Sequence, residues 1–431
     1  MKDRRRATLV LAAAAIVAVS CSKIEPITAP SLSSGSVDFS VVAAAGGALT
    51  AGFQSGGLVN RHQTHTYVSY FAQQVGAHAL DLPLIDGNGR PPLLEIKRLV
   101  PLPVRIAAID TVRGNLTNDQ LPTAYHNMGV PGALLRDLTD PTRYGNNPFF
   151  ADIARDADRG SVLRQLSQQI APKPTFLLLE FGTSEVQGPA AAGTTAGLVS
   201  VGGFEDSLAH ALDSLALLLP GVEIAIMNVP DVTGLPYFTT NSNKQLDRNG
   251  QPVLDANGRP RFLLGPGGVP LTASDLVLLP ARARLEDGYG YPAGTYSYLG
   301  DDSVQGRGVG LSDAEVLNLT EQLTIQDRAR EYTFVIDTTA RSHDLAVVDL
   351  AGLYRKMRSP GFELRGVRYT STYITGGLLS LDGLLPNDLA HALVCNEVIR
   401  AVNAKYGSNI QPLDPLRFGT LTSSRAGPAR K

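Results

Sequence analysis

Residues 175–181 read Thr-Phe-Leu-Leu-Leu-Glu-Phe, an apolar run with the length of one strand. Such a run is typical of a strand that is buried on both faces of a sheet, because a half-exposed strand alternates apolar and polar residues. A second run of this kind, Val-Glu-Ile-Ala-Ile-Met-Asn-Val, occupies residues 222–229. We therefore expect both segments to be interior strands of a parallel sheet.

Helical patterns alternate with the strand patterns on either side of these runs. Phe204–Leu219 is amphipathic and joins the two buried strands, and a last helix is predicted from about Asp388 to Ala404, ending near Gly407. Ser312 and Glu315 form a capping-box signature, which predicts the start of a long helix that continues to about residue 343. This alternation predicts an α/β fold, a three-layer sandwich with a central parallel sheet.

Two segments interrupt the alternation with turn-forming residues. Asp86–Pro92 and Asp247–Pro260 contain Asn-Gly pairs, which are typical of tight hairpins, so we expect β-hairpin insertions there. The longer stretch from about residue 239 to residue 310 is interpreted as an insertion that could cover one end of the sheet.

The composition excludes several classes of protein. The chain has 431 residues, of which 43% are hydrophobic and 18% charged, and this balance excludes a mainly disordered protein. Its 38 Lys and Arg against 40 Asp and Glu give a net charge of -2, which disfavours nucleic acid as a partner. Two Cys exclude a disulfide scaffold or a four-Cys zinc site, and we predict neither a metal nor another cofactor.

The N-terminus has the pattern of an export signal. Basic residues at positions 2 and 4–6 precede the apolar run Ala7–Val19, which is shorter than the roughly 20 residues that a membrane span needs. The run ends in Ala-Val-Ser-Cys at residues 18–21, which resembles a bacterial lipobox. We predict a signal peptide at residues 1–20 and acylation of Cys21, which would bind the chain to a lipid membrane. The alternative is an ordinary signal peptide with an incidental cysteine.

The remaining boundaries follow from this reading. Residues 21–36, rich in Ser and Pro, are interpreted as the lipid anchor and a flexible tether, residues 37–412 as the α/β domain, and residues 413–431 as a tail. Ser22 rather than Asp after the cysteine favours the outer membrane in lipoproteins, so we expect an exported protein anchored in the bacterial cell envelope.

Four short blocks resemble those of the GDSL, or SGNH, hydrolases. Residues 46–52, Gly-Gly-Ala-Leu-Thr-Ala-Gly, resemble the family's Gly-Asp-Ser-Leu-Thr-Ala-Gly block. Residues 127–132 (Asn-Met-Gly-Val-Pro-Gly) resemble its second block, residues 182–185 (Gly-Thr-Ser-Glu) stand where it has Gly-x-Asn-Asp, and residues 382–386 (Asp-Gly-Leu-Leu-Pro) stand where it has Asp-x-x-His-Pro. The resemblance covers roughly residues 38–407 and implies an SGNH, or flavodoxin-like, fold.

The resemblance also implies roles, two of which this chain cannot fill. Ala48 stands at the position of the nucleophilic Ser, and Leu385 stands at the position of the catalytic His. Asp382 matches the remaining triad acid, while Gly132 and Ser184 match the oxyanion-hole positions, with Ser184 replacing an Asn. Because loss of a triad member lowers the rate by about 10⁴-fold, we expect an inactive site.

Several other residues have side chains of the chemistry that the missing groups would supply. His391 and Asp388 form a second Asp-x-x-His in the wrong register, so a structural helix-face histidine is favoured. The remaining candidates are interpreted as turn, loop or surface residues without catalytic or metal-binding roles: Thr50, Ser55, His62, His65 and His126. Glu185 is expected to hold its turn by hydrogen bonds.

Two functions of different class follow. The first is a protein that binds a small-molecule, acyl or glycan ligand, or a partner, without hydrolysis, and the residues at positions 48 and 385 favour it. The second is an ester hydrolase, of lipase or carbohydrate-esterase type, with non-standard catalytic residues. A third reading is an envelope protein that makes surface contacts and has a vestigial crevice.

Overall fold

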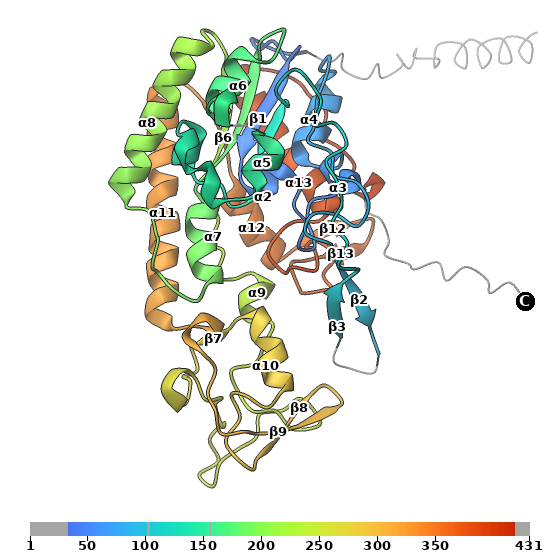
Figure 1. Ribbon diagram of the computed structural model, residues 1–431, viewed down its shortest axis with the longest axis vertical. Helices are drawn as coiled ribbons and strands as arrows, with labels where there is room; N and C mark the ends of the chain where they lie inside the picture. The colour runs from blue at the N-terminus through green and yellow to red at the C-terminus, as the bar shows by residue number, and fades with distance from the viewer. Residues whose placement is uncertain (1–32, 101–103, 156, 419–431) are drawn as a thin grey trace, which may run out of the picture. The chain divides into compact units, whose positions relative to one another are not determined.

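The computed structural model describes residues 33–100, 104–155 and 157–418 (Figure 1). The predicted signal peptide and Cys21 lie outside these ranges. Within them, every helix is too short or too polar to cross a membrane.

Five parallel strands form the central sheet of the molecule. In spatial order they are β11 (Ala346–Val348), β6 (Glu223–Met227), β5 (Phe176–Glu180), β1 (Val42–Gly46) and β4 (Asn127–Gly129). All four strand pairs are parallel. Every residue of β5 and four of the five residues of β6 are buried, which confirms the prediction from the apolar runs at residues 175–181 and 222–229.

Helices cover both faces of this sheet, so the predicted α/β three-layer sandwich is confirmed. One layer contains α4 (Tyr67–Val75), α12 (Leu350–Arg358) and α13 (Asp388–Tyr406), and the other contains α6 (Val162–Gln168), α7 (Thr183–Ala191), α8 (Val201–Leu218) and α11 (Leu319–Ser342) (Figure 1). The buried residues of α8 recur at helical spacing: Phe204, Leu208, Ala211, Leu212 and Leu215. Phe204 stacks on Tyr332 of α11, with ring centroids 4.2 Å apart.

The predicted start of the long helix is wrong. The capping box of Ser312 and Glu315 closes only one 3₁₀ turn, because the chain then forms a short strand, β10 (Val316–Leu317), which pairs with β7 (Leu276–Val277). A second capping box, between Asn318 and Glu321, begins α11.

The stretch interpreted as an insertion, from about residue 239 to residue 310, supplies most of a second hydrophobic core, which includes Leu263, Val277 and Tyr291. Three tight turns follow one another, closed by bridges between Leu246 and Pro252, Leu254 and Pro260, and Leu264 and Pro270. The first two lie in the hairpin segment predicted at residues 247–260. In each of these two, one aspartate oxygen (Asp247 or Asp255) accepts two backbone N–H groups of its own turn.

The hairpin predicted at residues 86–92 is wrong, because Ile85 bridges to Leu116 and Arg90 bridges to Leu58 rather than to each other.

Shorter elements complete the described chain. The hairpin of β2 (Leu94–Arg98) and β3 (Arg105–Ala108) is tied to the insertion hairpin of β8 (Tyr296–Leu299) and β9 (Asp302–Gln305) by ion pairs from Arg98 and Arg105 to Asp302. The remaining short elements are α2 (Ala48–Ala51), α3 (Asn60–Gln63), α5 (Phe149–Ile153), α9 (Pro236–Thr239), α10 (Arg282–Glu286), β12 (Phe362–Leu364) and β13 (Val367–Tyr369).

Candidate functional site

The first three sequence blocks meet at the carboxyl edge of the sheet. Gly46, the last residue of β1, is in register with Gly129 of β4 and with Glu180 of β5. The chain leaves β1 into α2 and leaves β5 into α7, so both helices begin at this edge. Ligands of open parallel sheets bind at such edges.

The second block holds the first one in place. The side-chain amide of Asn127 donates to the carbonyl oxygen of Thr50 over 2.8 Å, and its oxygen accepts the N–H of Gly129 over 3.0 Å. A side chain at residue 129 would collide with the backbone of residues 50 and 51, so only glycine lets α2 pack this closely on β4.

The predicted nucleophile position lies at the start of α2. Ala48 is half-buried there and presents only a methyl group. A Cβ atom at residue 47 would lie 2.5 Å from Ser184 Oγ, so the structure brings Ser184, a predicted oxyanion-hole residue, against the turn before Ala48. Gly132, the other predicted oxyanion-hole residue, is exposed. It lies two residues after Val130, whose N–H donates to the carbonyl oxygen of Gly46. The oxyanion roles of Ser184 and Gly132 stay predictions.

Asp382, the matched triad acid, is bonded to its own loop. One carboxylate oxygen accepts the N–H groups of Leu384 and Leu385, both over 2.9 Å. The other accepts the hydroxyl of Ser380 over 2.8 Å and the N–H of Gly56 over 3.3 Å. Burial raises the pKa of Asp382 despite these bonds. The side chain of Leu385, at the His position, is buried with 4% exposure in the core.

Sequence reasoning missed a buried carboxylate beneath the first block. Glu180 is 2% exposed, and its Oε2 accepts the N–H of Gly47 over 3.0 Å and the hydroxyl of Thr50 over 3.2 Å. That hydroxyl also lies 2.8 Å from the phenol oxygen of Tyr67, so Thr50 is a core residue rather than a nucleophile. Burial raises the pKa of Glu180 to about 7. The sequence feature that could have indicated this buried carboxylate is a single acidic residue, Glu180, in the otherwise apolar strand β5.

Glu185, the second buried acid, holds the turn before α7, as predicted. Its oxygens accept the N–H of Gly182 over 2.8 Å and the N–H of Leu135 over 2.6 Å. Burial raises the pKa of Glu185 to about 7, and the neighbouring carboxylate of Glu180 adds to the rise. Two buried carboxyl groups with raised pKa values therefore lie beneath the edge.

His391 is a core residue of α13. It is fully buried, its Nδ1 accepts the N–H of Tyr67 over 3.2 Å, and the two rings are stacked. Burial lowers the pKa of His391 to about 4, so the ring is neutral at pH 7. The prediction of a structural histidine is in line with this environment.

A histidine–aspartate pair lies elsewhere, and sequence reasoning missed it. His62 Nδ1 is 2.9 Å from Asp388 Oδ1, and Gln54 Nε2 donates to the same oxygen over 2.9 Å. These bonds lower the pKa of Asp388, against the opposing effect of burial. No group of three or more His, Cys, Asp or Glu side chains with metal-site geometry occurs in the described part of the chain.

Two further candidates resolve into structural roles. Ser55 lies in a turn with φ of 51°, where its N–H donates to Ser380 and its hydroxyl accepts the N–H of Leu381 over 3.2 Å. The prediction of a solvated loop position for His126 is wrong. It is 6% exposed, because it directly precedes β4 and its Nδ1 accepts the N–H of Asp81 over 3.1 Å.

Three comparisons with known proteins were made, with family models, with curated proteins and with solved structures. No protein-family model matches the sequence, and no curated protein matches it. Three solved structures align with most of the chain. LAE5, an α/β hydrolase enzyme from the metagenome of Lake Arreo, Spain, has 13% identity and a TM-score of 0.35 over 84% of this chain and 95% of its own.

The other two are bacterial. A protein assigned as a GDSL-like lipase from Parabacteroides merdae has 11% identity and a TM-score of 0.35 over 86% of this chain and 98% of its own. The lipase/acylhydrolase from Enterococcus faecalis has 11% identity and a TM-score of 0.33 over 86% of this chain and 100% of its own. The five-stranded parallel sheet, with helices on both faces and three of the four blocks at one edge, has the three-layer architecture expected from the sequence resemblance.

Proposed function

We propose that this chain is a lipid-anchored envelope protein with a hydrolase-type fold that binds a ligand or partner and lacks Ser–His catalysis. The observation that carries the proposal is the hydrogen bonding of Asp382. Its Oδ1 accepts the backbone N–H of Leu385, the residue at the His position, where a triad acid would orient an imidazole. Together with Ala48, this leaves neither a nucleophile nor a base at the predicted positions.

The proposed class of ligand follows from the backbone groups at the carboxyl edge of the central sheet. Gly56 N donates to Asp382 Oδ2, and Gly47 N, in the turn after β1, donates to Glu180 of β5. A crevice at this edge would retain backbone donors suited to the carbonyl or acyl oxygens of a small-molecule, acyl or glycan ligand.

Ester hydrolysis tests the proposal directly. We expect the mature protein to release no nitrophenol from short-chain nitrophenyl esters above a heat-treated control. The double variant Ala48→Ser, Leu385→His is expected to gain measurable turnover, and each single variant serves as its matched control. Robust turnover by the unmodified protein, carried by a side chain of the edge, would contradict the proposal.

The anchor has a separate test. We expect metabolic labelling with palmitate in a bacterial host, and we expect the label and outer-membrane recovery to disappear in Cys21→Ser. Labelling that persists in this variant would exclude Cys21 as the acylation site. That result would exclude the predicted membrane anchor but would not bear on the proposed ligand binding.

A hydrolase with non-standard residues is the second candidate, and one observation favours it. His62 Nδ1 faces Asp388, which leaves Nε2 as the available ring nitrogen, the arrangement of a general base with its orienting acid. If this pair activates water, His62→Gln abolishes any esterase activity while His210→Gln, on the exposed side of α8, leaves it unchanged. Equal activity in both variants would exclude the His62–Asp388 pair.

A further inference from the structure

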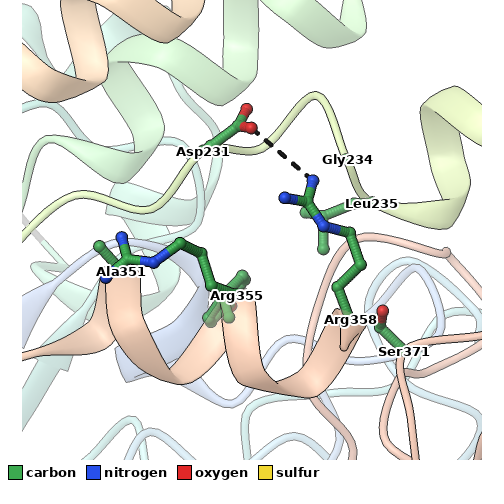
Figure 2. A pocket seen from close by; sticks show the side chains of 8 residues that line it. Asp231, Gly234, Leu235, Ala351, Arg355, Arg358 and Ser371 are labelled. Atoms are coloured by element: carbon green, nitrogen blue, oxygen red, sulfur yellow. Dashed lines mark ion pairs between the residues drawn. The ribbon is translucent and has the colours of Figure 1, made fainter. Parts of the chain in front are cut away.

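A recess beside α12 contains an ion pair of its own. Figure 2 shows Arg358 extending across the recess toward Asp231, with 3.9 Å between a guanidinium nitrogen and a carboxylate oxygen. Arg355 points instead along α12 toward Ala351 (Figure 2). The two guanidinium groups therefore do not converge on a shared ligand. The outer face of α11, in the other helical layer, is free of this objection.

That face carries apolar side chains that the fold leaves in solvent. α11 runs alongside α7 and α8 (Figure 1), and its Tyr332, which stacks on Phe204 of α8, is buried. On the other side of the helix, Leu319 is 46% exposed, Leu323 is 47% exposed and Phe334 is 68% exposed. Single exposed apolar side chains are common on soluble domains, whereas several on one helix face indicate a contact surface.

An acid and a base share this face with the apolar side chains. At 3.6 residues per turn, Leu319, Leu323, Asp327, Arg330 and Phe334 fall within an arc of about 80° around the helix, and we call this set the α11 stripe. Asp327 and Arg330 are both exposed and form an ion pair with each other. Because their charges cancel, the stripe has no net attraction for an anionic lipid surface.

The order of these side chains is complementary to itself when the helix direction is reversed. Leu323 and Phe334 are equidistant in sequence from the midpoint between residues 328 and 329, and so are Asp327 and Arg330. In an antiparallel pair of α11 helices centred on this midpoint, Leu323 of each copy lies opposite Phe334 of the other. Asp327 of each copy likewise lies opposite Arg330 of the other, so unlike charges face each other across a two-fold axis.

We propose that the α11 stripe is the contact surface of a homodimer, in which two copies of α11 pack antiparallel about residues 328 and 329. A single pair of helices buries less than the roughly 1,200 Å² of a stable interface, so we expect a weak dimer with a Kd of about 0.1 mM. The stripe shares no residue with the four sequence blocks, so this inference is separate from the proposed function.

Sedimentation equilibrium on the full chain tests the dimer, with Cys21→Ser in every sample to keep acyl chains out of the measurement. We expect this parent to be mostly monomeric at about 10 µM and mostly dimeric at about 0.3 mM. Asp327→Arg and Arg330→Asp each set like charges against each other across the axis, and each should weaken the dimer roughly tenfold or more. An equimolar mixture of these two variants should recover the affinity of the parent, because each copy then faces the opposite charge.

The apolar contacts have their own variants. Phe334→Ser removes two apolar contacts from each dimer and should weaken it roughly tenfold. Val367→Ser, at an exposed position in β13, is the matched control and should leave the dimer unchanged. Melting temperatures equal to that of the parent would show that these exposed variants remain folded.

Disulfide formation tests the register. Chains with Leu323→Cys and chains with Phe334→Cys, mixed and oxidised, should form a linked dimer that contains one chain of each kind. Neither variant alone should do so, because its two cysteines would lie about 16 Å apart along the helix axis, and a disulfide needs Cα atoms within about 7 Å. Cys395 is buried and should not take part.

Three results would overturn the inference. The first is a parent chain that stays monomeric at about 0.3 mM. The second is a dimer that Phe334→Ser and Arg330→Asp leave as strong as Val367→Ser does. The third is disulfide formation by either cysteine variant alone that equals that of the mixture, which would exclude the antiparallel register.

Discussion

Asp388 is the first residue of α13 and Asp382 lies six residues before it in the preceding loop, yet their hydrogen-bond partners differ in kind. Asp382 accepts bonds from two backbone N–H groups of its own loop, from Ser380 and from Gly56. Asp388 faces an imidazole, that of His62, and a side-chain amide, that of Gln54. The comparison teaches that Asp382, although it stands in the matched sequence block, accepts hydrogen bonds from its own loop and contacts no imidazole of the described chain. The histidine that pairs with Asp388 comes from a distant part of the chain.

The largest expected effect is on the free energy of unfolding, when Asp382 no longer accepts the hydrogen bonds of its loop. Asp382→Ala leaves the N–H groups of Leu384 and Leu385 without their acceptor, and we expect the free energy of unfolding to fall by about 4 kcal/mol. Asp382→Asn keeps an acceptor oxygen and should lose less than half as much. Denaturant unfolding followed by circular dichroism measures both. Equal stability of Asp382→Ala and the parent chain would mean that the loop does not depend on this carboxylate.

Glu180 extends the comparison to a carboxylate that is buried beneath the first block. Its pKa rises from 4.5 to about 7 on folding, so the folded chain binds a proton that the unfolded chain releases between these values. The contribution of Glu180 to stability is therefore largest below pH 4.5 and is lost as the pH rises through about 7, a change of about 3 kcal/mol.

Glu180→Gln should remove this pH dependence. We expect the difference in unfolding free energy between the variant and the parent to grow in favour of the variant from pH 4.5 to pH 8. Glu363→Gln, at an exposed position in β12, is the matched control and should follow the parent. A parallel pH profile for Glu180→Gln and the parent would show that Glu180 titrates normally.

The smallest expected effect concerns the other side of the comparison. His62→Ala removes the imidazole from Asp388, whose bond to Gln54 remains, and we expect a loss of about 1 kcal/mol in unfolding free energy. His210→Ala, at an exposed position in α8, should change it by less than about 0.5 kcal/mol. The lowered pKa of Asp388 means that its contribution is present above about pH 4 and is lost in acid. A His62→Ala variant as stable as His210→Ala would indicate that the pair is a surface contact.

Much of the architecture was predictable from local sequence. The apolar runs at residues 175–181 and 222–229 identified interior strands, because burial on both faces removes the polar alternation. Gly407 ends α13 in the left-handed region, with φ of 66°, as its position after the last helix predicted. The start of α11 was missed because two capping boxes stand six residues apart, and only the pairing of β10 with β7 decides between them.

The candidate site was less predictable. The sequence blocks indicated which turns lie at the sheet edge, and the structure places three of them there. Pairing between His62 and Asp388 joins residues 326 positions apart, and no local pattern specifies it. The burial of Glu180, the last residue of β5, likewise depends on residues distant in sequence. Thr50 of the first block donates to its carboxylate, and Tyr67 of α4 contacts Thr50.

By itself, the sequence determined the strands, the alternation with helices and the absence of Ser and His at positions 48 and 385. These follow from residue types and their spacing, which act over a few positions of the chain. Only the tertiary structure decided that Asp388 meets the imidazole of His62 and that Glu180 is buried beneath the first block. Such relations depend on elements that are distant in sequence, and packing against the common sheet brings them together.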